Sequence, residues 1–502
     1  MGCPPMNFLI SHIAQLLLFA AFLLRSTSAD CSIVRRGVSK DLLLLGTVLT
    51  DGGAQSDSAV LVQAGKITYV GDICRLGTRG SEAAAAASVV NCTGSVISPG
   101  FINTHEHLDF STVSPFPDIG ESVSHRHDWR LGMRNHTMRE VPVNGSVVDA
   151  TTWGELRHLF SGTTSIIGAK MVPGLARNLD FADGLEDGLK SRVVRYDTFP
   201  LKDPHGIMRS GDCDYGPDPI NQATVTSYHR YIAHIGEGID IEAANEFACL
   251  SNATFDTTPA LDGSGLSTDI IAANVALVHA LGLSRRDFEV VAARGAKVIW
   301  SPRSNMSLYR KTLNVTHLLE AGITVALGTD WLPSGSATIH REAACAASAT
   351  SEIYGVKLSA KLLWQMVTVN AAVVAGFEDQ LGSLEVGKLA DIVVFGGKSQ
   401  GENGEHGDST AVDDPFEQAI FASQEKIELV LRGGKVLLAS SALRDLALGT
   451  CEEVRFGSAE KVACVADELG ISFNELETML QGVYPAVLPR LPPYEPTCHS
   501  KG

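Results

Sequence analysis

The stretch Pro99-Gly100-Phe101-Ile102-Asn103-Thr104-His105-Glu106-His107 joins a short hydrophobic run to two histidines spaced two residues apart. In a β-strand, side chains at this spacing point to the same side of the sheet. Two imidazoles that face the same way suit a borderline metal ion such as zinc. The stretch therefore predicts a buried strand that ends in a pair of metal ligands, His105 and His107.

Further hydrophobic runs lie between helical segments throughout residues 99–383. The predicted strands are residues 101–105, 163–168, 192–199, 231–234, 275–279, 297–300 and 324–328. Alternating strands and helices are typical of a parallel sheet. Most ligand candidates follow the carboxyl ends of these strands, where (β/α)₈ barrels carry their active sites. We predict an α/β fold with a TIM-like (β/α)₈ barrel, and we expect its missing eighth strand within residues 200–230.

Both ends of the chain show a different pattern of short hydrophobic stretches separated by turn residues, which is typical of antiparallel strands. They predict one small β-sandwich domain built from two distant parts of the sequence. The expected organisation is a first β-sandwich part, the barrel, a second β-sandwich part and a C-terminal tail: residues 30–98, 99–383, 384–445 and 446–502.

Residues 1–29 have the features of a secretory signal peptide. A hydrophobic run over residues 16–24 precedes Thr27-Ser28-Ala29, which suits cleavage after Ala29. An uncleaved signal anchor stays open as an alternative, because no lysine or arginine precedes the run. Secretion agrees with N-glycosylation triplets at five asparagines, which together predict an extracellular glycoprotein: Asn91, Asn135, Asn144, Asn252 and Asn314.

The composition is that of a globular enzyme, with 45% hydrophobic and 19% charged residues and a formal charge of −17. An acidic protein repels phosphate backbones and anionic lipids. We therefore expect no nucleic-acid partner, and no membrane partner once the signal is removed. Nine cysteines besides Cys3 leave at least one expected free thiol, and the sequence does not indicate how the others pair.

Six motifs occur in a characteristic order. They are the opening stretch of residues 99–107, His234-Ile235-Gly236-Glu237-Gly238, Val278-His279, Ser301-Pro302-Arg303-Ser304-Asn305, Gly328-Thr329-Asp330 and Gly387-Lys388-Leu389-Ala390-Asp391-Ile392-Val393. Over roughly residues 41–440 the chain resembles the amidohydrolase superfamily. It is most similar to the one-metal branch that holds cytosine deaminase, guanine deaminase and the triazine hydrolases.

The resemblance implies one divalent metal ion, zinc or alternatively iron, that activates water for attack on a planar carbon. Its implied ligands are His105, His107, His234 and Asp330. Glu237 would carry a proton from the water to the leaving nitrogen, and His279 would orient the substrate atom that gains charge. Asp330 would also act as a base. Asn305 would bind the substrate. The segment after Asp330 departs from the usual pattern of that branch, and its Trp331 either stacks on a flat heterocyclic substrate or packs against the neighbouring helix.

The resulting hypothesis is a hydrolase of non-peptide carbon–nitrogen bonds in a small cyclic or heteroaromatic substrate. Deaminase and cyclic amidohydrolase both fit, and the substrate itself is not indicated. An alternative is a secreted dipeptidase-like or acyl-amino-acid amidohydrolase, whose usual second metal would need a bridging lysine; Lys170 is the available candidate. A non-catalytic scaffold relative is a third possibility. Homodimerisation is common among relatives, but no interface can be identified.

A second His-x-His pattern occurs in Ser124-His125-Arg126-His127-Asp128-Trp129. No hydrophobic strand precedes it, and its neighbours are charged. It therefore predicts a loop after the first barrel strand, either exposed to solvent or lining the pocket entrance.

Overall fold

The structure is a computed structural model that describes residues 30–76, 81–141, 146–189, 192–216, 218–261, 264–397 and 414–499. The predicted signal peptide, residues 1–29, lies outside the described residues, and so does the glycosylation triplet at Asn144. No described helix combines the length and the hydrophobicity that a membrane crossing requires.

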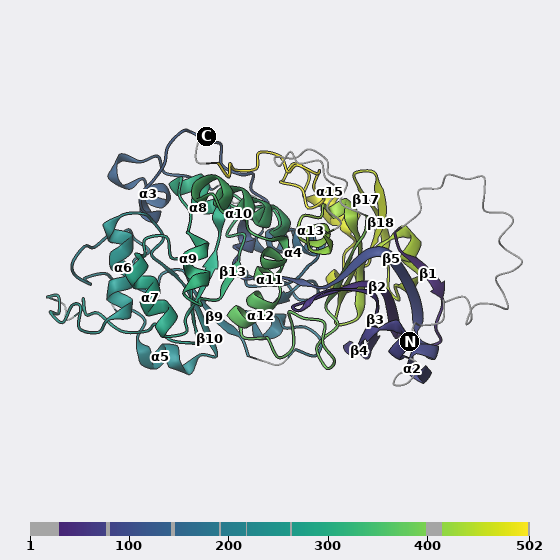
Figure 1. The fold of residues 1–502 in the computed structure, drawn as a ribbon. Coiled ribbons are helices and arrows are strands. Elements are labelled where there is room, and N and C mark those ends of the chain that lie inside the picture. Colours follow the sequence, from purple (N-terminus) through teal and green to yellow (C-terminus); the bar gives the residue numbers. More distant parts are fainter. Residues whose placement is uncertain are drawn as a thin grey trace, which may run out of the picture.

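One large sheet brings together strands from both ends of the chain, as the purple and yellow-green arrows of Figure 1 show. Its order is β17-β18-β16-β15-β14-β5-β2-β3-β4, with β1 paired to β5. The strands are β1 (Ser32–Arg35), β2 (Leu42–Thr50), β3 (Gly53–Gln63), β4 (Lys66–Asp72), β5 (Ser88–Pro99), β14 (Ile392–Phe395), β15 (Ile427–Arg432), β16 (Lys435–Ser440), β17 (Glu452–Phe456) and β18 (Ala459–Ala463). Neighbouring strands are antiparallel except β2 and β5. Residues 446–502, expected as a separate tail, thus contribute β17 and β18 to this sheet.

Eight parallel strands between these ends form two further sheets, with the orders β13-β12-β11-β10-β9 and β6-β7-β8. They are β6 (Phe101–Asn103), β7 (Thr163–Ile166), β8 (Arg177–Asn178), β9 (Val194–Asp197), β10 (Arg230–Ile235), β11 (Val275–His279), β12 (Lys297–Trp300) and β13 (Val325–Leu327). Seven lie at the positions predicted from the sequence. The expectation of the eighth within residues 200–230 is wrong, because that strand is β8, which is too short to show a hydrophobic run.

Backbone hydrogen bonds connect the two parallel sheets at both edges. The N–H of Val194 donates to the carbonyl of Leu179 over 2.9 Å, and the N–H of Thr104 donates to that of Leu327 over 3.4 Å. A buried hydrophobic cluster takes residues from, or directly after, all eight strands: Ile102, Ile167, Leu179, Val194, Ile232, Ala276, Val278, Ile299 and Ala326. Two parallel sheets therefore share one interior.

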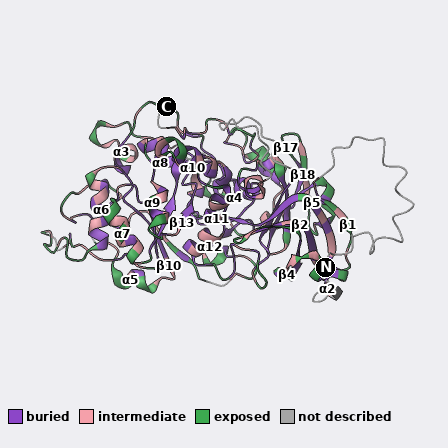
Figure 2. Ribbon diagram, viewed as in Figure 1, coloured by how far each residue is buried: buried purple, intermediate pink, exposed green. Residues whose placement is uncertain are grey.

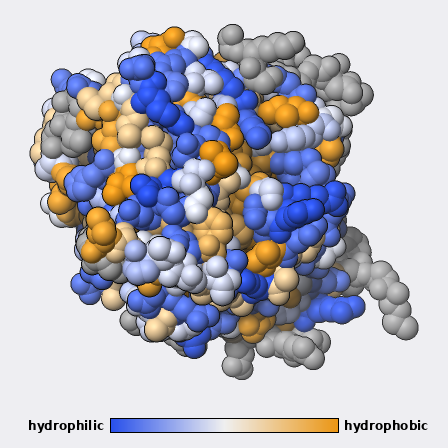
Figure 3. Space-filling model, turned by 90° about the vertical axis from the view of Figure 1, so that its left-hand side faces the viewer, coloured by the Kyte–Doolittle hydropathy of each residue, from blue (hydrophilic) through white to orange (hydrophobic). Residues whose placement is uncertain are grey.

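Helices follow most of these strands and cover them on the outside (Figure 1). The helices longer than four residues are α2 (Ser81–Ala86), α3 (Arg126–Leu131), α4 (Val147–Leu159), α5 (Gln222–Ser227), α6 (Ile241–Ser251), α7 (Arg285–Ala293), α8 (Pro302–Tyr309), α9 (Val315–Glu320), α10 (Ile339–Tyr354), α11 (Ala360–Met366), α12 (Val369–Ala375), α13 (Pro415–Ile420) and α15 (Phe473–Met479). Figure 2 shows buried residues along the strands and exposed residues on the outer helices and loops. On the end of the molecule seen in Figure 3, hydrophobic residues lie in separate groups between hydrophilic ones.

Four disulfides join pairs of described cysteines: Cys31–Cys92, Cys213–Cys249, Cys345–Cys498 and Cys451–Cys464. Cys74 is also disulfide-bonded. No described cysteine has a free thiol. The expectation of at least one free thiol concerned the nine cysteines that remain without Cys3, which lies outside the described residues, and it stays a prediction for the chain after signal cleavage.

Candidate metal centre

The predicted ligands lie at the carboxyl ends of strands β6, β10 and β13, and His279, predicted as a catalytic residue, lies at that of β11. His105 and His107 follow β6, which ends at Asn103 and is therefore shorter than predicted. His279 ends β11 and Asp330 follows β13, both with a positive φ, of 65° and 67°. Residues other than glycine rarely adopt this conformation, because it brings Cβ close to the backbone. Strained backbone of this kind is concentrated at functional sites.

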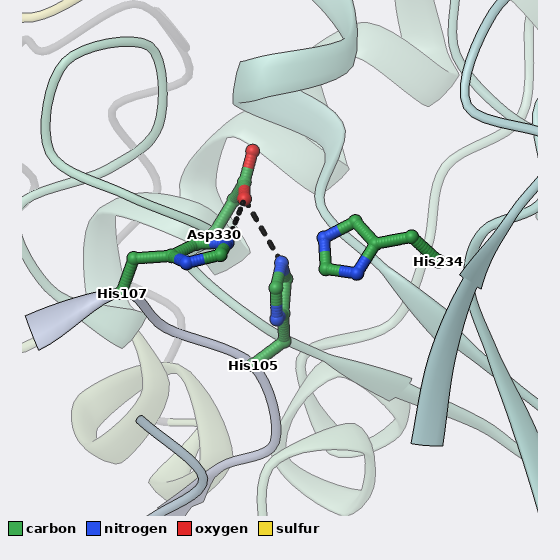
Figure 4. A group of neighbouring side chains, drawn as sticks. All are labelled: His105, His107, His234 and Asp330. Carbon is green, nitrogen blue, oxygen red and sulfur yellow. Dashed lines mark hydrogen bonds and ion pairs between the residues drawn. The ribbon is translucent and has the colours of Figure 1, made fainter. Parts of the chain in front are cut away.

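Four side chains from these strand ends surround one centre (Figure 4). One ligand atom from each of His105, His107, His234 and Asp330 lies within 4.8 Å of the others. Oδ1 of Asp330 is 2.9 Å from Nε2 of His105 and 3.6 Å from Nε2 of His107. The structure therefore brings together all four residues that the sequence selected as ligands.

Burial and neighbouring charges give His107, His234 and Asp330 the protonation states that a bound cation requires. Burial, together with the neighbouring His105, lowers the pKa of His107 to about 3. Burial also lowers the pKa of His234 well below its usual value. Burial by itself would raise the pKa of Asp330, but His279 and His105 hold it below its usual range. Neutral imidazoles beside an ionised carboxylate are the forms that bind metal ions.

The donor set fits a divalent metal ion. Three imidazoles and one carboxylate form a typical ligand set for zinc, and they also suit iron. His105 and His234 are at most 2% exposed, and Nε2 of His105 lies 2.9 Å from Oδ1 of Asp330, so solvent does not compete for these ligand atoms. The residues present could therefore hold the metal that the motifs imply.

Glu237 and His279 lie beside this cluster. Nε2 of His279 is 4.0 Å from Oε2 of Glu237 and 4.0 Å from Oδ1 of Asp330. Tyr309 donates a hydrogen bond of 2.8 Å from its hydroxyl to Oε1 of Glu237. Burial raises the pKa of Tyr309 well above its usual value, so the phenol keeps the proton that it donates. One carboxylate oxygen is thereby fixed, and the other faces His279.

Helix α8 contributes two further residues to the centre. Oδ1 of Asn305 lies 3.2 Å from Nδ1 of His279, and its buried Nδ2 has no partner among the described residues. Ser304 donates a short hydrogen bond to Oδ2 of Asp330 and lies 2.8 Å from the hydroxyl of Ser334. Asn305 thus orients His279, and its predicted role in substrate binding stays a prediction.

Trp331 is 6% exposed and belongs to an aromatic cluster. Its ring centroid lies 5.1–5.5 Å from the rings of Phe110, Phe116 and Trp129, and 6.4 Å from that of His107. The indole packs against aromatic neighbours next to the metal ligands. A substrate contact of Trp331 therefore stays a prediction.

The sequence interpretation missed three residues that contact the centre: Tyr196, Ser304 and Tyr309. The hydroxyl of Tyr196 lies 3.3 Å from Nε2 of His107. Tyr309 follows Asn305 by four residues on α8, and residues at this spacing share a helix face. That spacing was the available signal for Tyr309, whereas Ser304 stood unassigned inside a motif and Tyr196 had no signal.

The second His-x-His segment begins a helix and is buried, so the prediction of a solvent-exposed loop is wrong, whereas a place at the pocket entrance stays a prediction. Its residues form the start of α3, and His125, Arg126, His127 and Asp128 are all at most 1% exposed. Lys170, the candidate bridging lysine, is exposed in the turn after β7. Neither belongs to the cluster of metal ligands.

The charge of Arg126, at the start of α3, is neutralised by carboxylates from distant segments. Nη2 of Arg126 lies 2.7 Å from Oδ2 of Asp203 and 3.0 Å from Oε1 of Glu246. Glu246 also accepts a hydrogen bond of 2.9 Å from the N–H of Gly236, and the N–H of Arg126 donates to the carbonyl of Glu237 over 3.1 Å. The network therefore holds the Gly236–Glu237 backbone on two sides.

Comparisons with known proteins agree with this geometry. The sequence profile of the Amidohydrolase family matches residues 231–437. The 5'-deoxyadenosine deaminase of Methanosarcina mazei is 27% identical over 386 residues, which cover 69% of this chain and 82% of that protein. Imidazolonepropionase of Bacillus velezensis is 23% identical over 394 residues, 70% of this chain and 86% of that protein.

Solved structures show the same fold at low identity. Atrazine chlorohydrolase of Arthrobacter aurescens, complexed with zinc, has a TM-score of 0.56 at 19% identity and covers 79% of this chain and 95% of its own. An adenosine deaminase of Xanthomonas campestris with bound zinc has a TM-score of 0.51 at 18% identity, with coverages of 80% and 93%.

Proposed function

Because the chain belongs to the amidohydrolase family and is a hydrolase of carbon–nitrogen bonds other than peptide bonds, we propose that it is a one-metal deaminase of small heteroaromatic amines. The observation that carries this proposal is the placement of Glu237 beside His279 and Asp330 at the edge of the ligand cluster. A deaminase needs a group there that moves a proton to the leaving nitrogen.

We propose zinc as the metal, held by His105, His107, His234 and Asp330. A divalent ion in this position supplies a Lewis acid that activates water near neutral pH. Support comes from the ligand set and from the zinc in the two solved relatives. Iron is the alternative that the same ligands allow.

Glu237 carries out the proton transfers, and neighbouring residues hold the reacting groups in position. Glu237 takes a proton from water while the water oxygen bonds to the ring carbon of the substrate. Glu237 then gives that proton to the amino nitrogen as the carbon–nitrogen bond breaks. The products are the oxygenated heterocycle and ammonia. Tyr309 keeps Glu237 in place, and Asn305 keeps His279 directed at the substrate atom that gains negative charge.

The aromatic cluster around Trp331 supports a flat substrate. Offset and edge-to-face contacts between aromatic rings are favourable by about 0.5–1.5 kcal/mol each. A heteroaromatic ring next to His107 would join rings that already pack in this way. Several curated relatives deaminate adenine nucleosides by name, so a purine-like amine is the first substrate to test.

Ammonia release is the decisive experiment. Purified protein loaded with zinc would be incubated with adenine nucleosides, cytosine, guanine and amino-triazines, and ammonia would be measured alongside the change in ring absorbance. Glu237→Gln should abolish release, whereas Glu242→Gln, a partly exposed position on α6, should not. Turnover of cyclic amides without ammonia would replace deaminase by cyclic amidohydrolase. Full activity of Glu237→Gln would contradict the proton transfer.

We also propose that the eight parallel strands form a (β/α)₈ barrel and that the mature protein is secreted. The interior cluster shared by all eight strands supports the barrel. The four described disulfides support an oxidising compartment. Amino-terminal sequencing of protein from the medium of a secreting host should begin at Asp30; a start at Met1 or retention in the membrane fraction would contradict cleavage after Ala29.

A further inference from the structure

A second cavity lies outside the metal centre, between α8, α10 and the C-terminal segment. Its volume is about 690 Å³. The lining includes four arginines: Arg139, Arg303, Arg310 and Arg341. The chain as a whole carries a formal charge of −17, so this gathering of cations runs against its overall charge.

Helix α8 separates the cavity from the catalytic residues. Arg303 and Ser307, four residues apart, line the cavity, as does Arg310 at the end of the helix. Asn305 and Tyr309, also four residues apart, contact His279 and Glu237 instead. Residues four apart share a helix face, but the first pair is offset by two residues from the second. The two pairs therefore lie on different faces of α8. The cavity is therefore a separate chamber on the far face of α8.

Carboxylates already bind the arginines of this chamber. Arg310 donates to both oxygens of Asp118, over 2.7 and 2.8 Å. Glu495 accepts from Nε of Arg341 over 2.9 and 3.0 Å, and its Oε2 also lies 3.2 Å from Nη2 of Arg303. Arginine favours carboxylate and phosphate groups because its planar donors match their oxygens. The lining itself shows which chemistry the chamber accepts.

The carboxylates in the lining are fewer than the arginines. Two carboxylates, Asp118 and Glu495, face four guanidinium groups. The buried Nη1 atom of Arg310 has no hydrogen-bond partner among the described residues. Burial also lowers the pKa of Arg139, whose side chain contacts the carbonyl of Pro117 and the ring of Phe116. The chamber thus contains a buried guanidinium donor that lacks an acceptor among the described residues.

The C-terminal segment completes the chamber wall. Residues 494–499 line the cavity. The disulfide between Cys345 and Cys498 fixes this segment to α10, and Nη1 of Arg303 donates to the carbonyl of Pro496. The chamber therefore exists only when the end of the chain is folded back onto α8 and α10.

From these observations we propose that the chamber is a binding site for a small organic anion that carries a carboxylate or phosphate group. The ligand replaces water next to Arg139 and Arg310 and supplies the acceptor that Nη1 of Arg310 lacks. Phe116 lines the chamber and contacts Trp331, which in turn contacts the metal ligand His107. Only these two aromatic rings therefore lie between a bound anion and His107. This site is independent of the deamination proposed above.

Isothermal titration calorimetry on the full metal-loaded protein tests the proposal, with inorganic phosphate and succinate as separate probes at low ionic strength. One bound anion per chain is expected, with affinity that falls as salt rises. Arg139→Gln and Arg310→Gln should each weaken binding about tenfold, the loss expected for one charge-assisted hydrogen bond. Glu495→Gln should strengthen binding, because it removes a competing carboxylate while Cys498 still anchors the segment.

The test is specific because the arginine variants should weaken anion binding and Glu495→Gln should strengthen it. Arg285→Gln, an exposed position on α7 outside the chamber, is the matched control and should bind as the parent does. Tighter binding of succinate would identify the ligand as a carboxylate, and tighter binding of phosphate as a phosphate. The proposal is wrong if neither probe binds, or if Arg139→Gln, Arg310→Gln and Glu495→Gln all bind as the parent does. A Glu495→Gln variant that binds more weakly than the parent would also overturn it.

Discussion

Replacing Arg126 with methionine should destabilise the protein and impair catalysis, although Arg126 does not belong to the ligand cluster. The guanidinium is fully buried between Asp203 and Glu246, which are themselves at most 1% exposed. Methionine fills a similar space but leaves both carboxylates without their counter-charge. Glu246 would then adjust its position, and with it the N–H of Gly236 that it binds.

The structure allows the size of both effects to be worked out. Breaking a buried ion pair by removing one partner costs about 3–5 kcal/mol. In a chain of this size each kcal/mol lowers the melting temperature by roughly 1–2 °C, so a decrease of about 3–10 °C is expected. A displacement of about 1 Å in a catalytic group costs about 100-fold in rate. We therefore expect kcat to fall by about that factor, with a smaller change in KM.

Differential scanning calorimetry and steady-state kinetics on the metal-loaded protein provide the two measurements. Arg126→Lys keeps the charge and should recover most of the stability, but less of the rate, because an ammonium cannot reproduce the planar donors. Arg130→Met is the matched control on the same helix. The guanidinium of Arg130 bonds the neutral groups His127 and Pro204, so its loss should cost about 1 kcal/mol or less.

The expected decrease in melting temperature is about 3–10 °C, so an Arg126→Met variant that melts within about 1 °C of the parent would refute the reasoning. It would be refuted equally if Arg130→Met were as damaging. A large loss of stability with unchanged kcat would show that Arg126 supports the fold but does not position Glu237.

Three further predictions concern metal content, pH and the C-terminal segment. Metal analysis by mass spectrometry should find about one zinc or iron ion per chain, lost in His234→Ala; two ions per chain would favour the dipeptidase-like alternative. Burial raises the pKa of Glu155 to about 8 from 4.5. Between pH 4.5 and about 8 the folded protein therefore keeps a proton that the unfolded chain releases. The free energy of unfolding should fall by up to about 5 kcal/mol as the pH rises through this range. Denaturant titrations should show a flatter pH profile for Glu155→Gln, and an unchanged profile would contradict this. Cys345→Ser opens the disulfide to Cys498, which closes a sequence separation of 153 residues, and should cost about 2–5 kcal/mol by calorimetry; an unchanged melting temperature would contradict it.

The metal ligands and His279 could be predicted from the sequence because each is tied to a local signal. His105, His234, His279 and Asp330 all follow hydrophobic runs, and strand ends meet at one edge in a parallel fold. The eighth strand could not be predicted in the same way. Arg177 and Asn178 are polar, and two residues show no periodicity.

The buried start of α3 could not be predicted for a different reason. A segment with His125, Arg126, His127 and Asp128 reads as a solvated loop, since charged residues are seldom buried unless they are paired. The pairs come from Asp203 and Glu246, which are distant in the sequence. Only the tertiary structure shows that these charges neutralise one another.

The sheet built from both ends of the chain cannot be completed until late in biosynthesis, because its strands are synthesised far apart in time. Strand β5 ends at Pro99, and its neighbour β14 begins at Ile392. Ribosomes add about 5–20 residues per second, so β5 waits roughly 15–60 seconds for that neighbour. During this interval β5 has an unpaired edge, which invites pairing with other chains. In the nascent chain residues 96–99 therefore stay open to such pairing until β14 has been synthesised.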